Sequence, residues 1–383
     1  MRVKPDYIRP LNVRHGLVDM PMGAGGRATA QLIEELFAAA FKNPYLEEGH
    51  DGAVMPPLTG RLVTACDAHV VNPLFFPGGD IGRLAVAGTV NDVAVCGARP
   101  LYLTASFILE EGLPLIHLKT IVDSMAATAQ EAGVLVVTGD TKVVERGKGD
   151  GVYIATTGIG EAFNGVSISG RNARPGDAVF ITGTLGDHGL TILSHREGLS
   201  FGADLKSDCA PLAGLISPLV EQLGNRIHVL RDPTRGGLAT TLNEIAAQSA
   251  VGIEIQEAAI PVTDTVQSGC DFLGLDPLYV ANEGKLIVIT DGGVKDEALR
   301  ILKTSPYGKN AALIGEVTED PEGVVRMETT LGGHRLVDWL NADPLPRSGA
   351  KQFRPPRATN PGGRKKAFRV LSEPRVSGFG FLS

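Results

Sequence analysis

The stretch DAHVVNPLFFPGGDIGRLAVAGTVNDVAVC, residues 67–96, contains the pattern that decides the fold. It follows a short strand predicted at residues 61–65, and its second part, residues 79–96, is predicted to form a helix. Four residues of that helix are unusually small, namely Ala85, Ala87, Gly88 and Ala94. Small side chains allow another backbone to approach closely. The stretch therefore predicts a helix packed directly against a neighbouring element.

Strands and helices alternate on both sides of this stretch. In the first half, strands are predicted at residues 100–109, 134–138 and 152–160, and helices at 28–41 and 115–132. In the second half, strands are predicted at 178–182, 227–230, 251–255, 285–289 and 311–317, and helices at 212–223, 238–248 and 295–303. This alternation in a chain of 383 residues predicts an α/β fold with two domains. The turn signal Arg174-Pro175-Gly176-Asp177 marks the junction, with domains at 1–170 and 171–345 and a basic tail at 346–383.

Charge and composition exclude several classes of protein. From residue 348 onward the chain has a net charge of +7, which leaves –14 on residues 1–347. The net negative charge of residues 1–347 disfavours binding to the phosphate backbone, so no nucleic-acid partner is expected. No apolar run approaches the length of a membrane span, and the N-terminal residues lack the apolar core of a signal peptide. Four scattered cysteines without a CxxC pair indicate a reduced, cytoplasmic protein.

Four aspartates next to small residues are candidate metal ligands: Asp51, Asp67, Asp92 and Asp140. Magnesium is usually held by one or two carboxylates together with substrate phosphates. Carboxylates that converge from several strand or helix ends would suit that chemistry. The alternative for each aspartate alone is ordinary turn formation beside glycine.

Two glycine-rich turns are candidate phosphate sites. Gly25 and Gly26 precede the first predicted helix, and Arg235 lies in Asp232-Pro233-Thr234-Arg235-Gly236-Gly237 before another helix. Backbone N–H groups at a helix start attract anions, and arginine binds phosphate oxygens. Neither turn is a Walker or a G-x-G-x-x-G motif, so each could also be a plain strand-to-helix connection.

Two further charged residues are candidates for proton transfer. Lys142 follows Asp140 by two residues, so on an extended strand both side chains point to the same side. Glu283 lies in Ala281-Asn282-Glu283-Gly284-Lys285, just before a predicted strand. Either residue could instead be an ordinary surface charge.

Taken together, these motifs resemble those of the HypE family of hydrogenase maturation factors, within the AIR-synthetase-like (PurM-like) ATP-binding superfamily. The resemblance extends over residues 16–347 and is most specific at residues 67–82 and 88–94. Further support comes from Gly139-Asp140-Thr141-Lys142-Val143-Val144, Asp232-Pro233-Thr234-Arg235-Gly236-Gly237-Leu238 and Asn282-Glu283-Gly284-Lys285.

The resemblance implies a PurM-like fold of mixed sheets whose N-terminal domains pair into an intersubunit β-barrel in a homodimer. It also implies binding of ATP and Mg²⁺ at the groove between subunits. The metal would be held by Asp51, Asp67, Asp92 and Asp140, and the nucleotide by these aspartates with Gly25, Gly26, Asn91 and Arg235. Lys142 and Glu283 match the catalytic pair proposed to handle protons.

The reaction implied by the resemblance is the ATP-dependent dehydration of an S-carbamoyl group to a thiocyanate, the source of the cyanide ligands of [NiFe]-hydrogenase. A HypF-like carbamoyltransferase would supply the group, and a HypC/HypD-like iron scaffold would receive the product. Two alternatives stay open: another PurM-like ATPase similar to selenophosphate synthetase, and a non-catalytic nucleotide-binding assembly factor.

The tail departs from the family pattern. Family chains end in a cysteine shortly after a Pro-Leu-Pro-Arg-like segment, whereas here Asp343-Pro344-Leu345-Pro346-Arg347 is followed by a basic, proline-containing stretch without cysteine. Such a composition is typical of disorder. We therefore expect a disordered tail and a chain that cannot carry the carbamoyl group on its own terminus.

Overall fold

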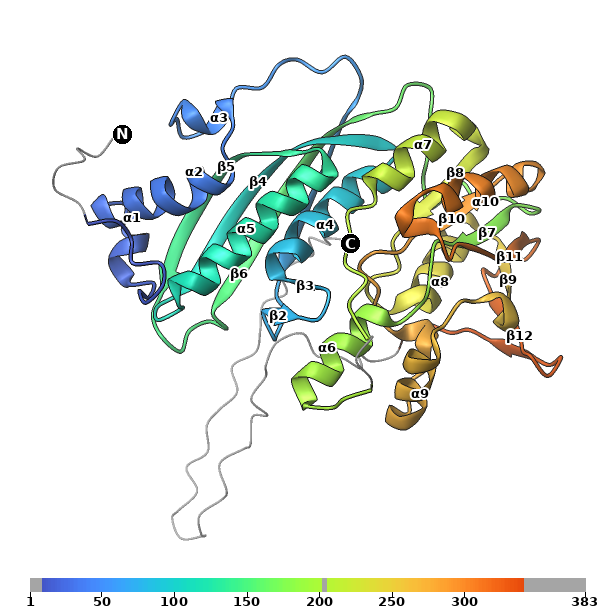
Figure 1. Cartoon of the computed structure of the whole chain (residues 1–383). Coiled ribbons are helices and arrows are strands. Elements are labelled where there is room, and N and C mark those ends of the chain that lie inside the picture. The colour runs from blue at the N-terminus through green and yellow to red at the C-terminus, as the bar shows by residue number, and fades with distance from the viewer. Residues whose placement is uncertain (1–8, 202–204, 341–383) are drawn as a thin grey trace, which may run out of the picture. The chain divides into compact units, whose positions relative to one another are not determined.

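The structure is a computed structural model that describes residues 9–201 and 205–340 (Figure 1). Its first sheet has the order β1-β6-β4-β5. The strands are β1 (Leu62–His69), β6 (Val152–Ala162), β4 (Ala98–Glu110) and β5 (Leu135–Val144). The β4–β5 pair is parallel and the other two pairs are antiparallel. β1 and β5 therefore form opposite edges of this sheet.

Helices α4 (Ile81–Val95) and α5 (Leu115–Ala132) cover one face of the first sheet (Figure 1). Almost every residue of α4 is buried, because the sheet lies on one side of it and α7 (Ala213–Leu223) on another. Two glycines of β6 leave room for this contact. A Cβ atom at Gly158 or Gly160 would lie 2.7 Å or 2.5 Å from the Val93 side chain. The prediction of a helix in close contact with its neighbours is confirmed.

The second sheet has the order β13-β12-β9-β11-β7-β10-β8. Its strands are β7 (Ala178–Ile181), β8 (Ile227–Arg231), β9 (Gly252–Gln256), β10 (Ile287–Thr290), β11 (Ala312–Thr318), β12 (Val325–Glu328) and β13 (His334–Leu336). Both faces of this sheet are covered by helices. On β7, Phe180 belongs to the hydrophobic cluster of α7 and α10 (Lys295–Thr304), and the adjacent residue, Val179, belongs to the cluster of α8 (Gly237–Ser249). This alternation confirms a mixed α/β fold.

The remaining elements surround the two sheets. The N-terminal helix runs through α1 (Arg27–Leu32), a π-helical turn at Ile33–Phe37 and α2 (Ala38–Ala40). Shorter elements are α3 (Pro44–Glu47), β2 (Phe75–Phe76) and β3 (Gly79–Asp80). Helices α6 (Asp187–Glu197) and α9 (Asp264–Leu273) were not predicted: α6 lacks a clear apolar stripe, and the stripe of α9 is confined to a short helix.

One prediction about strand ends is wrong. Asp140 and Lys142 were placed beyond a strand ending at residue 138, but β5 continues to Val144. The reason is its partner β4, which is 13 residues long and pairs with β5 as far as Glu110 and Val144. Both side chains therefore project from the interior of an edge strand.

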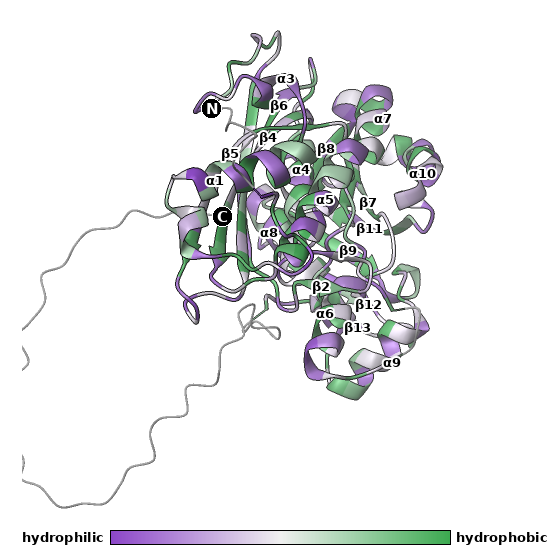
Figure 2. Cartoon of the chain, turned by 60° about the vertical axis from the view of Figure 1, so that its left-hand side comes forward, coloured by the Kyte–Doolittle hydropathy of each residue, from purple (hydrophilic) through white to green (hydrophobic). Residues whose placement is uncertain are grey.

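The face of the first sheet opposite α4 and α5 is left largely open by the described residues, although Tyr45 of α3 packs on Tyr102 there. Apolar side chains are exposed on it, with Leu62 64%, Ile108 43% and Leu135 41% accessible. In Figure 2 the strands of this sheet are largely hydrophobic (green), whereas the surrounding helices show both green and purple. A largely open sheet face with apolar side chains is typical of an interaction surface.

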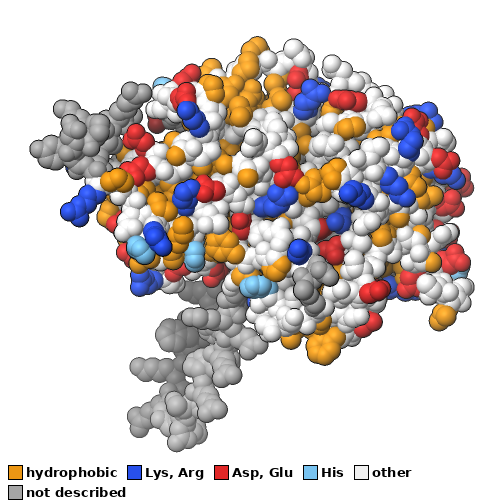
Figure 3. Space-filling view, viewed as in Figure 1, with side chains coloured by type: hydrophobic (Ala, Val, Ile, Leu, Met, Phe, Trp, Pro, Cys, Tyr) orange, Lys and Arg blue, Asp and Glu red, His pale blue; other side chains and the backbone are white. Residues whose placement is uncertain are grey.

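The described helices include none that is long and apolar enough to cross a membrane. On the face shown in Figure 3, the basic side chains of the described residues are interspersed with acidic ones and form no continuous stripe.

The predicted boundary at residue 170 lies between the strands of the two sheets and stays a prediction. The tail from residue 346 lies outside the described residues.

Candidate functional site

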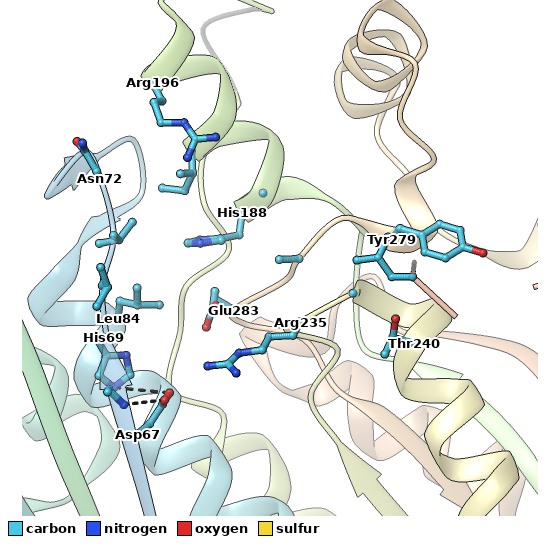
Figure 4. Close-up of a pocket in the computed structure, with 18 residues that line it drawn as sticks. Asp67, His69, Asn72, Leu84, His188, Arg196, Arg235, Thr240, Tyr279 and Glu283 are labelled. Atoms are coloured by element: carbon cyan, nitrogen blue, oxygen red, sulfur yellow. Dashed lines mark hydrogen bonds and ion pairs between the residues drawn. The ribbon is translucent and has the colours of Figure 1, made fainter. Parts of the chain in front are cut away.

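A cavity of about 350 Å³ lies between β1 and three loops of the second half of the chain (Figure 4). β1 and the turn after it supply one wall, and the starts of α6 and α8 and the loop before β10 supply the others. Its charged and polar lining includes Asp67, His69, His188, Arg196, Arg235, Thr240, Tyr279 and Glu283. Two of the predicted candidates, Arg235 and Glu283, thus face Asp67 across one space.

Asp67 and His69 occupy the end of β1 on the side covered by α4. The His69 Nε2 atom is 3.7 Å from the Asp67 carboxylate and 3.2 Å from Thr156 Oγ1. His69 is buried, whereas the Asp67 side chain is 37% exposed toward the cavity. The strand therefore presents a carboxylate to the cavity and holds it beside an imidazole.

Asp92 lies on α4 near Asp67 and Asp232, and the electrostatics of this group are unusual. Burial, followed by the charges of Asp232 and Asp67, raises the pKa of Asp92 to about 7, against the opposite effect of Arg231 and Arg235. Burial also raises the pKa of Asp232. Such a raised pKa marks Asp92 as a carboxylate whose charged form is disfavoured in this environment and would be stabilised by a nearby positive charge.

Asn282 holds the loops around the cavity together. Its side-chain amide donates to the carbonyls of Pro233 and Val280 at 3.1 and 3.0 Å, and it accepts the N–H of Gly186 at 2.8 Å. These bonds join the Asp232–Gly237 turn, the start of α6 and the Glu283 loop. Figure 4 shows Arg235 and Glu283 pointing into the space beside Asp67.

Two features of the cavity wall indicate a ligand. Within residues 9–201 and 205–340, Arg235 makes no hydrogen bond or ion pair with protein, although it lies at the start of α8. Thr240 Oγ1 is a buried atom without a hydrogen-bond partner in this part of the chain. Buried polar atoms are usually paired, so an orphan at a cavity wall points to a polar group that binds there.

A second group of predicted residues lies at the other edge of the first sheet. The Lys142 Nζ atom is 2.6 Å from the Asp140 carboxylate on β5, as their spacing predicted. The hydrogen bond from Lys142 lowers the pKa of Asp140. Gly23, which precedes Gly25 and Gly26 in the chain, lies against the same strand, because a Cβ at Gly23 would lie 2.5 Å from the Val143 nitrogen. The Gly25 N–H is bonded to Thr29 Oγ1 at 3.0 Å.

Within one chain the four candidate aspartates do not all lie together, and their shared role at a groove between subunits stays a prediction. Asp140 is three strand spacings from β1, on the order of 14 Å, and its register partners place it on the sheet face opposite Asp67. Asp51 is exposed in the loop between α3 and β1. Within the described residues no group of three or more His, Cys, Asp or Glu is placed to hold a metal ion. Lys142 and Glu283 are likewise separated.

Asn91 has a different environment from the one expected of a cofactor ligand. It is buried in α4, where its amide donates to Ala210 O at 3.0 Å and accepts the Leu212 N–H at 2.7 Å. The residue ties α4 to the segment before α7. Its participation in nucleotide binding stays a prediction.

Several cavity residues were not among the predicted site residues. His69 in the cavity lining, and Asp232 outside it, stood within motifs already recognised, so their positions at strand ends were the available signal. His188 and Arg196 lie on the unpredicted helix α6, and Tyr279 and Thr240 are single polar residues without a motif. Only the arrangement of loops brings these four to the cavity.

The raised pKa of Asp92 predicts a pH-dependent stability. Because the folded-state value of about 7 exceeds the ordinary 3.8, the folded chain binds this proton more tightly than the unfolded chain, and stability falls as pH rises between these values. Between pH 6 and pH 8, in the absence of nucleotide, we expect a loss of about 1 kcal/mol that Asp92→Asn does not show. Urea unfolding of both proteins at the two pH values measures it, and equal pH dependence would contradict the assignment.

Comparisons with known proteins agree with this geometry. Residues 49–162 match the family model "AIR synthase related protein, N-terminal domain", and residues 174–328 match the corresponding C-terminal domain. The chain is 58% identical to the carbamoyl dehydratase HypE of Cupriavidus necator over 346 residues, covering 90% of this chain and 98% of that protein.

Solved structures extend the similarity to three dimensions. The crystal structure of a hydrogenase maturation protein HypE in complex with ATP superposes with a TM-score of 0.83 at 54% identity, covering 85% of this chain and 98% of that one. The HypE–HypF complex matches with a TM-score of 0.71 at 51% identity, covering 81% and 99% of the two chains. The PurM-like two-domain fold is thereby confirmed. The chain belongs to the HypE family of carbamoyl dehydratases, within the AIR synthase related proteins.

Proposed function

We propose that the chain is a hydrogenase maturation enzyme that uses ATP to dehydrate an S-carbamoyl group to a thiocyanate. The observation that carries this proposal is the cavity in which Glu283 and Arg235, from the second half, face Asp67, from the first (Figure 4). A relative with 54% identity has been solved with ATP, so ATP binding is part of the proposal. Arg235 and the glycines before α8 suit a phosphate group.

The carboxylates present fit a magnesium ion that arrives with the nucleotide. Asp92 and Asp67 lie near each other: burial raises the pKa of Asp92 most, and the charges of Asp232 and Asp67 raise it as well. Two carboxylates plus phosphate oxygens make a sufficient ligand set for magnesium, so a preformed group of three protein ligands is not required. When bound, the ion would neutralise charge on the phosphates during transfer. Asp67 and Asp92 would hold it, with Asp232 as a neighbouring carboxylate.

The chemistry assigns a separate task to Glu283. The carbamoyl oxygen forms a bond to the γ-phosphorus of ATP as ADP leaves, and the carbon–oxygen bond then breaks with release of phosphate. The amide nitrogen loses both protons as the carbon–nitrogen triple bond forms. Glu283 is placed to accept such a proton, and positioned bases typically contribute about 10²- to 10⁴-fold to a rate. Arg235 would hold the transferred phosphoryl group.

The test supplies the carbamoyl group from outside the chain. The full-length protein is incubated with Mg²⁺, ATP and a peptide ending in S-carbamoylcysteine, and ADP and peptide thiocyanate are quantified. We expect equal amounts of both products, and neither thiocyanate nor ADP above background when the peptide or ATP is omitted. ADP without thiocyanate would favour another PurM-like ATPase, and ATP binding without either product would favour a non-catalytic assembly factor.

Partners follow from the same proposal. A solved relative forms a complex with HypF, so we propose a HypF-like carbamoyltransferase as the donor and a HypC/HypD-like iron scaffold as the recipient. We also propose a cytoplasmic location, because the four cysteines are scattered in the sequence and include no CxxC pair.

We also propose that the largely open face of the first sheet forms the homodimer. The face carries exposed apolar side chains together with Asp140 and Lys142, the predicted residues that the single chain leaves far from Glu283. Pairing of two such faces would enclose these residues and close the strand edges. This arrangement gives Asp140 and Lys142 a route to the nucleotide that the single chain lacks.

The dimer proposal predicts a selective effect of charge on this face. Ile108 on β4 and Ile116 on α5 are both 43% exposed, so they form a matched pair. We expect Ile108→Glu to convert the protein from dimer to monomer at micromolar concentration, whereas Ile116→Glu stays dimeric, because only Ile108 lies on the largely open face. Sedimentation equilibrium distinguishes the two, and a monomeric unmodified chain would contradict the architecture.

A further inference from the structure

Residues 205–212 lie between α6 and α7 in the second half of the chain, and they are hydrogen-bonded to the first half. We call them the connecting segment. It makes four hydrogen bonds to the first half: Ser207 N to Pro77 O at 2.8 Å, Arg83 Nε to Cys209 O at 2.8 Å, Asn91 Nδ2 to Ala210 O at 3.0 Å, and Leu212 N to Asn91 Oδ1 at 2.7 Å. Arg83 and Asn91 both belong to α4, the helix that also carries Asp92. The connecting segment is therefore fixed to the helix that carries part of the proposed nucleotide site.

The same segment binds the main chain of the Glu283 loop through one carboxylate. Asp208 Oδ1 accepts the N–H of Glu283 at 3.1 Å, and Oδ2 accepts the N–H of Gly284 at 3.2 Å. The Lys285 Nζ atom lies 3.4 Å from Oδ2. The Asp208 and Lys285 side chains are only 3% and 12% exposed, so this buried negative charge is neutralised by a buried positive one.

Backbone packing adds to these bonds at Gly284. A Cβ atom at this position would overlap with the carbonyl of Asp208 and would lie 3.2 Å from the Ala210 nitrogen. Gly284 does not have a positive φ, so the reason for glycine is space rather than conformation. The Glu283 loop and the connecting segment therefore lie backbone against backbone.

On the basis of the function proposed above, we propose that Asp208 is a positioning residue that holds Glu283 in its catalytic place. It touches neither the nucleotide cavity nor a reacting atom, and it acts through the main chain of residues 283 and 284. Through Arg83 and Asn91 it also sets the place of Glu283 relative to α4. The role of Asn91 is then to position the connecting segment.

Loss of the carboxylate has a specific consequence. An asparagine at position 208 has one acceptor oxygen, so one of the two buried N–H groups loses its partner. A displacement of about 1 Å in a catalytic group can reduce a rate by about 100-fold. Binding of ATP, which depends on other residues, should change little.

The experiment compares Asp208→Asn with two variants in the full-length chain. Asp208→Asn/Lys285→Gln removes the buried lysine charge that the single substitution leaves unpaired. Asp177→Asn is the matched control, because Asp177 is also buried, accepts the Arg174 N–H at 2.8 Å and lies 2.7 Å from His228 Nδ1, away from the cavity. With the S-carbamoylcysteine peptide, we expect both Asp208 variants to lower kcat by about 10- to 100-fold, with the KM for ATP changed by less than about twofold. Asp177→Asn should lower stability but leave kcat unchanged.

Two further measurements separate positioning from loss of folding. If Asp208 acts through Glu283, Asp208→Asn/Glu283→Gln should be no slower than Glu283→Gln, whereas independent effects would multiply. Hydrogen exchange at residues 283 and 284 should accelerate in Asp208→Asn and not in Asp177→Asn. Multiplicative losses, or unchanged exchange together with unchanged kcat, would overturn the proposal. The exchange result does not need turnover, so absence of thiocyanate in the unmodified chain with accelerated exchange would refute the proposed function and keep the contact.

Discussion

Replacement of Asp92 by asparagine is expected to lower the rate of ATP hydrolysis by more than about tenfold while the fold stays intact. Burial and the neighbouring Asp232 and Asp67 raise the pKa of Asp92 to about 7. A bound cation would stabilise the charged form of this carboxylate. Asparagine keeps the size of the side chain and removes its charge. We expect Asp67→Asn to act in the same direction, since Asp67 shares the site.

Steady-state ADP formation in the presence of the S-carbamoylcysteine peptide, together with melting curves, measures this effect at several Mg²⁺ concentrations. Asp123→Asn is the control, because Asp123 is an exposed aspartate on α5 that pairs with Lys119. A normal ATPase rate in both Asp92→Asn and Asp67→Asn, with native melting curves, would remove this carboxylate group from the proposed site.

Replacement of Glu283 by glutamine is expected to reduce thiocyanate formation by at least about 100-fold, because the amide cannot accept a proton from the carbamoyl nitrogen. Glutamine retains the shape of the side chain, and the main-chain bonds of residue 283 to Asp208 do not depend on it. ATP binding should therefore be preserved. The loss would lie in kcat rather than in the affinity for nucleotide.

The assay is single-turnover formation of peptide thiocyanate, with ATP affinity measured by calorimetry on the same preparation. Glu221→Gln provides the control, since Glu221 is an exposed residue paired with Arg99. A variant of Glu283 that makes thiocyanate at the normal rate would mean that another group, such as Lys142 from a second copy, removes the protons.

Short sequence motifs located several candidate site residues, because each motif lies at or near the end of a helix or strand. Asp67 lies near the end of β1, Asp232 follows β8 directly and Glu283 lies just before β10, so short-range patterns were enough to locate them. The sequence also predicted that the Asp140 and Lys142 side chains point the same way, since alternate residues of a strand share one face. These contacts depend on neighbours in the chain.

Contacts between residues far apart in the sequence decided which candidate residues come together in the folded chain. Sheet order places Asp140 at the far edge from Asp67 within one chain, and sheet order is not encoded in any single motif. Helix α6 brings His188 and Arg196 to the cavity although its sequence has no clear apolar stripe, because tertiary packing stabilises it.

The sequence by itself therefore determined the α/β class, the small-residue helix beside the sheet, the turn motifs and the family resemblance. Each of these depends on the order of residues over short distances. Only the tertiary structure decided that Asp67, Asp92, Arg235 and Glu283 share one region while Asp140 and Lys142 lie apart, and that Asp208 and Asn91 connect the halves. The physical reason is that strand order and long-range hydrogen bonds join residues more than 70 positions apart, where the chain pattern contains no signal.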